Sequence, residues 1–404
     1  MAHSYELQKS MSKSVHNHSI AIVGAGAMGS GIAQVAAQAG HSVVLFDTNQ
    51  QALERSQIQL AKIADRQVIK GRWTPQESET LQGRIARTSK LQEVIGCALV
   101  LEAIVEDFDA KISLFQKIER IVPSSTILAT NTSSLSVTAL AGQLTHPERL
   151  LGLHFFNPAP LMALVEIVPA LQTDKAIVEQ CQTLMAAWKK SAVIAKDTPG
   201  FIVNRLARPF YGEALRIAEE GLYSLETIDA ALRAVGFRMG PFQLMDLIGN
   251  DVNYAVTCTV FDAFYFDPRY RPSLIQKQHV DAGWLGKKTR RGYYSYQEDG
   301  QVLAEDAPKV DSKAQEQISN RILSLLINEA ADALRLNIAS AEDLEIAMTK
   351  GVNYPKGLLK WGNDWGIANV LEELETLQQE YGEERYRPSP LLKQMASRGV
   401  KFDV

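Results

Sequence analysis

The chain has 404 residues, which is too long for one ordinary domain and predicts two or three. Its hydrophobic fraction of 46% and charged fraction of 22% are typical of a globular protein in water. The net charge of −4 argues against a nucleic-acid partner, which would need a basic excess. No run reaches the roughly 18 apolar residues of a membrane span.

The three cysteines, Cys97, Cys181 and Cys258, are widely spaced and form no CxxC pair. This usage predicts free, buried thiols in a reducing compartment, so neither a disulfide nor a metal site is expected. Residues 1–18 are polar and lack an apolar centre, which predicts a disordered tail rather than a secretory signal. We therefore expect a cytoplasmic protein.

The first predicted elements are a strand, a turn and a helix. Residues 19–23 form an apolar strand that runs directly into GAGAMGSG at 24–31, and an Ala-rich helix follows to Ala39. Residues 42–47 form the next strand, which ends in an acid. A GxGxxG match between a strand and a helix, with an acid about twenty residues on, is typical of a dinucleotide-binding unit.

Each small or acidic residue of this unit has a physical role. Gly24 permits the tight turn, Gly26 lets the backbone approach a pyrophosphate, and Gly29 lets the helix pack closely on the strand. Asp47 would accept hydrogen bonds from the ribose hydroxyls and repel a 2′-phosphate, so we expect NAD rather than NADP. The plainer alternative is that Asp47 only ends a strand.

Two further apolar strands are predicted within 97–107 and 126–134, and each runs into polar residues. The alternation of strands and helices predicts an α/β, Rossmann-type doubly wound domain with a parallel sheet. Ligands bind such sheets at the carboxyl ends of the strands, where Glu106, Asn131 and Ser133 lie.

Among the histidines, only His154 ends an apolar run, and Glu166 lies inside the next apolar run at 164–168. The NPAP segment between them favours a turn, so the two side chains could meet from neighbouring strands. Histidine is the usual base near neutral pH for an alcohol that loses hydride, and a buried carboxylate would fix its tautomer. The alternative is a core histidine and an unrelated, salt-bridged glutamate.

The segment KDTPGFIVNR at 196–205 is broken by Pro199 and Gly200, after which a helix is predicted over 201–221. This pattern indicates the exit from the nucleotide domain into a helical one. Asn204 lies one turn into the predicted helix, where its side chain could face solvent or the cleft.

Taken in order, these motifs resemble the L-3-hydroxyacyl-CoA dehydrogenases, particularly the bacterial 3-hydroxybutyryl-CoA type. The resemblance covers about residues 19–296 and recurs weakly beyond them. One departure is Arg290 with Arg291, where the family usually has a glycine after GKKT, and we expect a surface change there. The matching segments are GAGAMGSGIA (24–33), EAIVED (102–107), NTSSLS (131–136), GLHFFNPAPLMALVEIV (152–168), KDTPGFIVNR (196–205), GPFQLMD (240–246) and GKKTRRGYYSY (286–296).

The resemblance implies that His154 is the catalytic base, with Glu166 as its partner and Asn157 as a support. It also implies that Ser133 and Asn204 lie around the substrate oxygen, and that Glu106 and Lys111 lie near the nicotinamide ribose. The residues implied in cofactor binding are Gly24, Gly26, Met28, Gly29, Asp47, Glu106, Lys111 and Asn131.

The second half of the chain partly repeats the helical segment that precedes it. We expect a tail (1–18), an NAD-binding domain (19–198), a helical domain (199–296), a polar linker (297–312) and a second, degenerate helical copy (313–404). The matched pairs are 204–214 with 320–330, RYRPS at 269–273 with the same letters at 385–389, and GND at 249–251 with 362–364.

The second copy has no nucleotide domain before it, so Asn320, which matches Asn204, is expected to be structural. In single-copy members of the family the helical domain is the dimerisation surface. The resemblance therefore suggests that the second copy packs on the first and imitates a dimer partner. The chain would be a monomer with an internal pseudo-dimer, and a homodimer stays open as the alternative.

The predicted function is NAD-dependent oxidation of an L-3-hydroxyacyl-CoA to a 3-oxoacyl-CoA, with a short-chain substrate such as 3-hydroxybutyryl-CoA or 3-hydroxyadipyl-CoA. Basic residues of a predicted helix at 55–72, Lys62 and Arg66 among them, could attract the CoA phosphates or could simply face solvent. Two alternatives remain. One is a non-catalytic, crystallin-like NAD-binding protein, and the other is a dehydrogenase of a free sugar or hydroxy acid.

Overall fold

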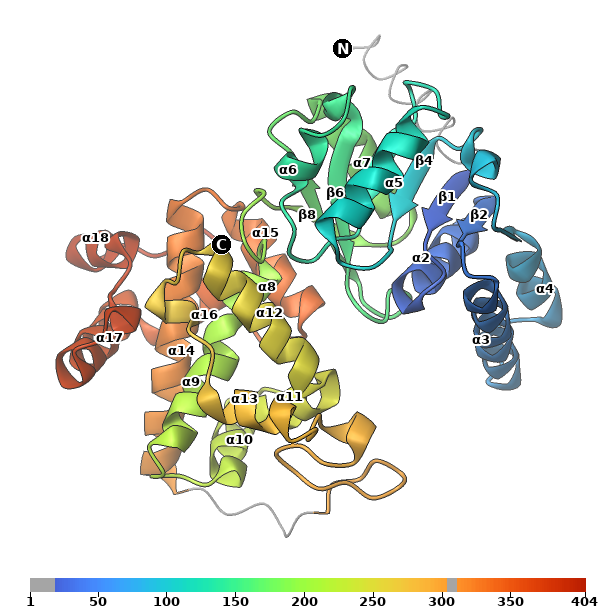
Figure 1. Ribbon diagram of the computed structural model, residues 1–404. Coiled ribbons are helices and arrows are strands. Elements are labelled where there is room, and N and C mark those ends of the chain that lie inside the picture. The colour runs from blue at the N-terminus through green and yellow to red at the C-terminus, as the bar shows by residue number, and fades with distance from the viewer. Residues whose placement is uncertain (1–18, 304–310) are drawn as a thin grey trace. The chain divides into compact units, whose positions relative to one another are not determined.

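The computed structural model describes residues 19–303 and 311–404 and divides into two compact units, Met1–Asp197 and Thr198–Val404 (Figure 1). The predicted tail at 1–18 lies outside the described residues, as does the 304–310 part of the predicted linker.

The first unit is built on one eight-stranded sheet. Its strands are β1 (Ile20–Val23), β2 (Val43–Phe46), β3 (Ile85–Thr88), β4 (Leu99–Glu102), β5 (Ile127–Thr130), β6 (Leu150–Phe155), β7 (Leu164–Pro169) and β8 (Ser191–Ile194).

The strand order is β3-β2-β1-β4-β5-β6-β7-β8. Strands β2 and β3 are added on one side of β1, and β4 to β8 are added on its other side. Strands β1 to β6 are parallel, β7 is antiparallel to β6, and β8 is parallel to β7. The Rossmann-type fold is confirmed, and the predicted parallel pairing holds for β1 to β6 but not for β6 with β7. The β6–β7 connection spans only 156–163, and a parallel crossover needs a dozen or more residues.

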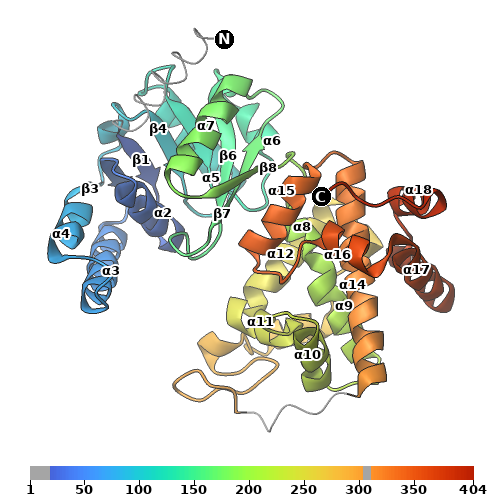
Figure 2. The same ribbon diagram turned by 180° about the vertical axis from the view of Figure 1, so that it is seen from behind.

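Helices cover both faces of the sheet. In Figure 1 helix α5 (Phe108–Glu119) lies in front of the sheet, and in the opposite view of Figure 2 helix α7 (Lys175–Ala187) lies in front of it. Most strand residues are therefore buried whichever face they point to, which explains why the strands read as continuous apolar runs. The other helices of the unit are α2 (Ala27–Gln38), α3 (Gln50–Ile69), α4 (Pro75–Gly83) and α6 (Val137–Ala141).

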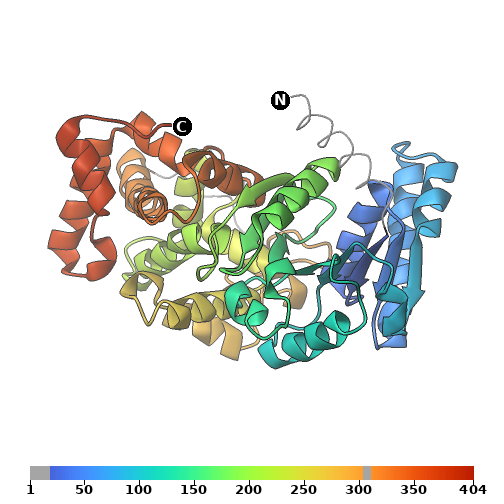
Figure 3. The ribbon, with the colours of Figure 1, turned by 90° about the horizontal axis from the view of Figure 1, so that it is seen from above.

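The second unit is helical. Its first series of helices is α8 (Val203–Leu206), α9 (Arg208–Glu219), α10 (Leu225–Ala234), α11 (Pro241–Ile248), α12 (Asn250–Ala263) and α13 (Leu274–Asp281). Its second series is α14 (Ser312–Arg335), α15 (Ala341–Ile346), α16 (Leu358–Trp365), α17 (Ile367–Tyr381) and α18 (Pro390–Arg398). In Figure 3 the red α17 and α18 region lies beside the orange α14.

The single helix predicted over 201–221 is wrong, because the chain forms α8 and α9 with a break at Ala207. Pro209 explains the break, since proline has no N–H to donate to the carbonyl of Arg205 one turn earlier. Helix α14, which has Leu325 at the matched position, runs on without interruption.

Each series has a short 3-10 turn before its last helix, Pro268–Tyr270 in the first and Glu384–Tyr386 in the second. One expected match is wrong. Gly249, with a φ of 104°, precedes α12, and the glycine at the same place before α17 is Gly366, with a φ of 99°. The segment 362–364 lies inside α16 instead.

Buried polar contacts join the two series in a reciprocal way. One glutamate of each series accepts a hydrogen bond from an arginine and another from a tyrosine of the other series, and all four bonds are 2.6 Å long. Buried charges are costly unless they are paired. Each series therefore supplies the arginine and the tyrosine that pair with the buried glutamate of the other series. The groups are Arg205 and Tyr270 on Glu329, and Arg321 and Tyr386 on Glu213.

A segment at 286–302 follows α13 and is held by isolated β-bridges. The buried carboxylate of Asp246 accepts hydrogen bonds from the N–H groups of Tyr293 and Tyr294, at 3.0 and 2.9 Å. Arg290 in this segment is exposed and has a φ of 58°, a conformation that glycine adopts without strain.

Candidate active site

The glycine turn after β1 has the shape expected of a pyrophosphate site. A Cβ at Gly24 would lie 2.5 Å from the carbonyl oxygen of Ala103, and a Cβ at Gly29 would lie 1.8 Å from the carbonyl oxygen of Gly24. A Cβ at Gly26 would meet nothing within 4 Å, so the space beside the start of α2 is open. The first N–H groups of a helix favour an anion, and the residues present therefore fit the pyrophosphate of NAD. Met28 lies in the first turn of α2 and is partly buried.

Asp47 follows β2, and its carboxylate reaches back to the glycine turn. Its Oδ2 accepts a hydrogen bond from the N–H of Ala25 at 2.7 Å, and its Oδ1 accepts one from the N–H of Asn49 at 2.8 Å. Asp47 therefore does more than end a strand, because it ties β2 to the turn. A carboxylate has about four acceptor positions, so it can also bind a ribose hydroxyl.

Lys111 lies between two carboxylates at the carboxyl end of β4. Its Nζ is 2.5 Å from Glu102 Oε1 and 3.2 Å from Glu106 Oε2. Glu102 and Lys111 are buried, and Glu102 also accepts hydrogen bonds from Thr130 Oγ1 and the N–H of Ile104, each at 2.7 Å. Glu102 is not among the site residues expected from the sequence, although an acid within an apolar strand is a signal for a buried ionic partner.

The loop after β5 carries Ser133 and is bound to Glu106. Oε1 of Glu106 accepts hydrogen bonds from Thr132 Oγ1 at 2.6 Å and from the N–H of Ser133 at 2.8 Å. Burial alone would raise the pKa of Glu106, but Lys111 and these hydrogen bonds outweigh it and hold the pKa below its usual value. Glu106 is therefore an anion at neutral pH that joins Lys111 to the Ser133 loop.

His154 and Glu166 lie directly opposite each other in the antiparallel β6–β7 pair. His154 Nδ1 is 2.6 Å from Glu166 Oε2, and the two residues are 5% and 0% exposed. An ionised Glu166 fixes the proton on Nδ1 and leaves Nε2 as the acceptor. The expected meeting of these side chains across the β6–β7 loop is therefore present in the structure.

The two asparagines near this pair differ in their contacts. Asn131 Oδ1 accepts a hydrogen bond from the N–H of Phe155 at 2.8 Å, which ties the Ser133 loop to the strand residue next to His154. Asn157 is exposed just beyond β6, and the ring that packs on His154 is that of Phe156, with centroids 4.5 Å apart. The support of His154 by Asn157 stays a prediction.

The first unit thus brings together the carboxyl ends of β1, β2, β4, β5 and β6, where most of the expected residues lie. Asn204 belongs to the second unit and lies in the short helix α8. Its place one turn into a long helix was expected, and the break at Ala207 puts it in a separate four-residue helix instead.

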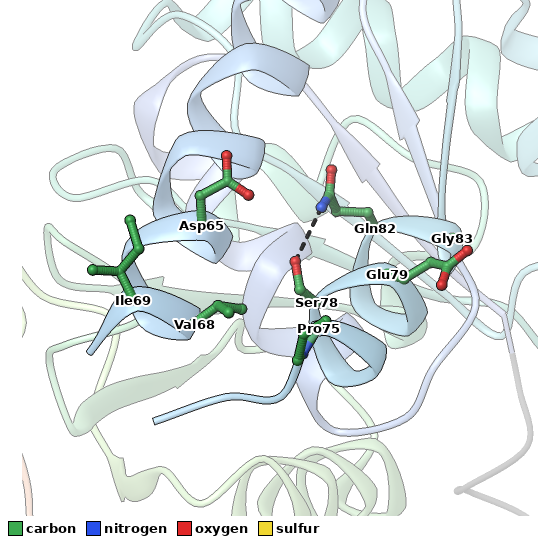
Figure 4. A pocket seen from close by; sticks show the side chains of 8 residues that line it. All are labelled: Asp65, Val68, Ile69, Pro75, Ser78, Glu79, Gln82 and Gly83. Atoms are coloured by element: carbon green, nitrogen blue, oxygen red, sulfur yellow. Dashed lines mark hydrogen bonds between the residues drawn. The ribbon is translucent and has the colours of Figure 1, made fainter. Parts of the chain in front are cut away.

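Lys62 and Arg66 are exposed on α3. An open groove of about 600 Å³ lies between α3 and α4, next to Asp65 and Ile69 of the same helix (Figure 4). Its charged lining residues are Asp65 and Glu79, so this groove suits an apolar group better than a phosphate.

The three cysteines are free, and burial raises the pKa of Cys97 to about 11 and that of Cys181 to about 12. Cys258, expected to be buried, is only half-buried. Across residues 19–303 and 311–404, no cluster of three metal-ligating side chains occurs. In the same part of the chain, no helix combines the length and the apolar character of a membrane span.

Comparison with known families matches most of the chain. The family described as "3-hydroxyacyl-CoA dehydrogenase, NAD binding domain" matches residues 19–198. The family described as "3-hydroxyacyl-CoA dehydrogenase, C-terminal domain" matches 200–296 and, separately, 318–401. The chain belongs to the 3-hydroxyacyl-CoA dehydrogenase family. It is therefore an NAD-dependent oxidoreductase.

Individual members of the 3-hydroxyacyl-CoA dehydrogenase family differ in how much of this chain they match. The 3-hydroxyadipyl-CoA dehydrogenase of Escherichia coli is 37% identical and covers 95% of this chain and 98% of its own length. A probable 3-hydroxybutyryl-CoA dehydrogenase of Bacillus subtilis is 40% identical over 69% of this chain and 97% of its own. A crystal structure of 3-hydroxybutyryl-CoA dehydrogenase from Escherichia coli K12 superimposes with a TM-score of 0.87 over 94% of this chain and 98% of that chain, at 37% identity.

Proposed function

We propose that this dehydrogenase oxidises the 3-hydroxyl group of a short-chain L-3-hydroxyacyl-CoA and that His154 is the base. The buried His154–Glu166 pair, with 2.6 Å between Nδ1 and Oε2, is the observation that carries the proposal. The names of the relatives support a four-carbon or six-carbon acyl group, as in 3-hydroxybutyryl-CoA or 3-hydroxyadipyl-CoA.

In the proposed reaction His154 Nε2 takes the hydroxyl proton while bound NAD accepts hydride from C3. Glu166 holds the proton on Nδ1 and faces the imidazolium that forms, with 2.6 Å between Nδ1 and Oε2. Ser133 and Asn204 polarise the substrate oxygen by hydrogen bonding. Glu106 and Lys111 hold the nicotinamide ribose, with Glu102 keeping Lys111 in place.

Lys62 and Arg66 are proposed to attract the phosphates of coenzyme A. Both are exposed, and neither forms an ion pair with another residue of the described chain. Exposed cations of this kind bind through long-range attraction that salt weakens.

We also propose that 313–404 is a second copy of the helical domain, with the linker before it, and that the two copies form an internal pseudo-dimer. The reciprocal bonds to Glu213 and Glu329 support this, since a two-fold interface pairs residue i with j and j with i. The two separate matches to the C-terminal domain family support it as well. The full-length chain is then expected to be monomeric.

A panel of 3-oxoacyl-CoA substrates of increasing chain length, followed by NADH consumption, tests the proposed activity. The highest kcat/KM is expected at four to six carbons, and free CoA should compete with the substrate. Turnover of a free hydroxy acid or sugar that free CoA does not inhibit would contradict the proposal. NADH binding without turnover of any substrate in the panel would favour a non-catalytic protein.

A further inference from the structure

The loop that carries Ser133 joins β5 to α6 and is fixed at its beginning by two side chains. Asn131 accepts from the N–H of Phe155, and Glu106 accepts from Thr132 and Ser133. These contacts tie the first half of the loop to β6 and to the end of β4.

The end of the loop and the first turn of α6 are held by a different carboxylate. Asp197 Oδ2 accepts a hydrogen bond from the N–H of Thr138 at 2.7 Å and one from Ser136 Oγ at 3.0 Å. Its Oδ1 accepts one from the N–H of Val137 at 3.2 Å. Ser136 Oγ in turn accepts from the N–H of Ala139 at 3.1 Å, so the Ser136 hydroxyl is fixed both as donor and as acceptor.

Asp197 reaches this loop from a distant part of the sequence. It follows β8 and is the last residue of the first unit, directly before Thr198. The chain then turns through Gly200 and Phe201, both with positive φ, at 75° and 46°. The last residue of the first unit, Asp197, therefore holds the end of the loop that carries Ser133.

A loop held at both ends has few conformations, and a reacting group needs such precision. A misplacement of about 1 Å can lower the rate about 10²-fold. We propose that Asp197 is a positioning residue for the reaction, which places the Ser133 hydroxyl by holding 136–138. This inference rests on the role proposed for Ser133 and adds a residue that does not itself touch the substrate.

The test is a double-mutant cycle between Asp197→Ala and Ser133→Ala in the full-length enzyme, with 3-oxobutyryl-CoA and NADH as substrates. Asp197→Ala is expected to lower kcat about 10- to 100-fold while the Kd for NADH changes less than about twofold. In the Ser133→Ala background the same substitution should have almost no further effect, because both changes remove one function. Amide hydrogen exchange at Val137 and Thr138 should become faster.

Asp174→Ala is the matched control, because Asp174 is an aspartate of the same unit that caps α7 by accepting from the N–H of Ala176 at 2.9 Å. It should leave kcat unchanged. If Asp197→Ala does not fold, Asp197→Asn, which keeps one acceptor oxygen, takes its place in the cycle.

A loss of kcat from the Asp197 change that is equally large with and without Ser133 would overturn the positioning role and leave the proposed function intact. Normal turnover by Ser133→Ala alone would contradict the role proposed for Ser133 and overturn the inference together with it.

Discussion

His154 is oriented by a contact that the strand register makes almost unavoidable. Residues opposite each other in an antiparallel pair have close Cβ atoms, and Glu166 stands opposite His154 with no exposure to solvent. A buried carboxylate has to be paired, and the imidazole of His154 is one partner within hydrogen-bonding distance. The same register therefore sets the tautomer of the ring.

Replacement of His154 by alanine should lower kcat by about 10²- to 10⁴-fold, because it removes the proton acceptor. Binding of NADH, measured by fluorescence titration, should stay as in the wild type. Glu166→Gln, which keeps the shape of the side chain, should cause a smaller loss of kcat. A His154→Ala variant with wild-type turnover would remove His154 from the mechanism.

Replacement of Glu102 by alanine should destabilise the first unit by about 3–5 kcal/mol, because it leaves the buried Lys111 without its nearest carboxylate. Urea unfolding measures the change. The exposed pair of Lys277 with Asp281 is the matched control, and Asp281→Ala should cost no more than about 1 kcal/mol. Equal losses in the two variants would show that the burial of Glu102 does not matter.

At the scale of elements, the sequence predicts what depends on local patterns and misses what depends on remote contacts. The strand, glycine turn and helix at 19–39 are predicted well because apolar runs and turn residues determine them. The antiparallel direction of β7 also follows from the short 156–163 connection. The alternation of strands and helices before it predicts a parallel sheet and gives no sign of this change.

The break between α8 and α9 has a local cause as well, since Pro209 interrupts the hydrogen bonds of the helix. By contrast, the bonds from Asp197 to 136–138 span about sixty residues and have no periodic signal. Candidate residues at strand ends can therefore be predicted from the sequence. The support from Asp197 requires the structure, whereas the acid Glu102 within an apolar strand is itself a signal in the sequence.

Asp229 of α10 allows a test of how the unfolding free energy depends on pH. Its carboxylate accepts a hydrogen bond from Tyr294 Oη of the segment 286–302 at 2.9 Å. Burial raises the pKa of Asp229 to about 6, and hydrogen bonds from Phe242, Tyr294 and Gln243 only partly oppose it. A raised carboxyl pKa means that the unfolded chain loses this proton first as the pH rises. Ionisation of Asp229 therefore lowers the unfolding free energy between about pH 4 and pH 6.

The unfolding free energy of the wild type relative to Asp229→Asn should accordingly fall as the pH rises through this range. Asp267 is the control of opposite sign: burial raises its pKa, but bonds and charge from Arg269 outweigh this and lower it. The advantage of the wild type over Asp267→Asn should grow as the pH rises from about 3 to 5. Parallel slopes for the two variants in urea titrations would contradict both assignments.

At the scale of the whole molecule, the second unit contains a buried contact between its two series of helices. The Bacillus subtilis relative matches 69% of this chain and 97% of its own length. Removal of α14 to α18 from this chain would uncover Glu213, Phe210 and the rest of the α9 and α10 surface on which α14 packs.

A chain truncated after Tyr296 should therefore associate, because it exposes a self-complementary apolar face with unpaired buried charges. Sedimentation equilibrium should show a dimer or larger species, and the full-length chain should be monomeric at the same concentration. A truncated chain that is monomeric and fully active would contradict the internal pseudo-dimer.

The reciprocal contacts of Glu213 and Glu329 lie within one polypeptide, so dilution does not weaken them as it would weaken the contacts of two separate subunits. Because both sides belong to one chain, their amino-acid sequences also need not be identical. Position 216 is an arginine that donates to the carbonyl of Arg271, whereas the matched position 332 is an aspartate that accepts from Arg335. In a symmetric dimer every substitution appears on both sides at once, whereas in the proposed internal pseudo-dimer each side can change alone.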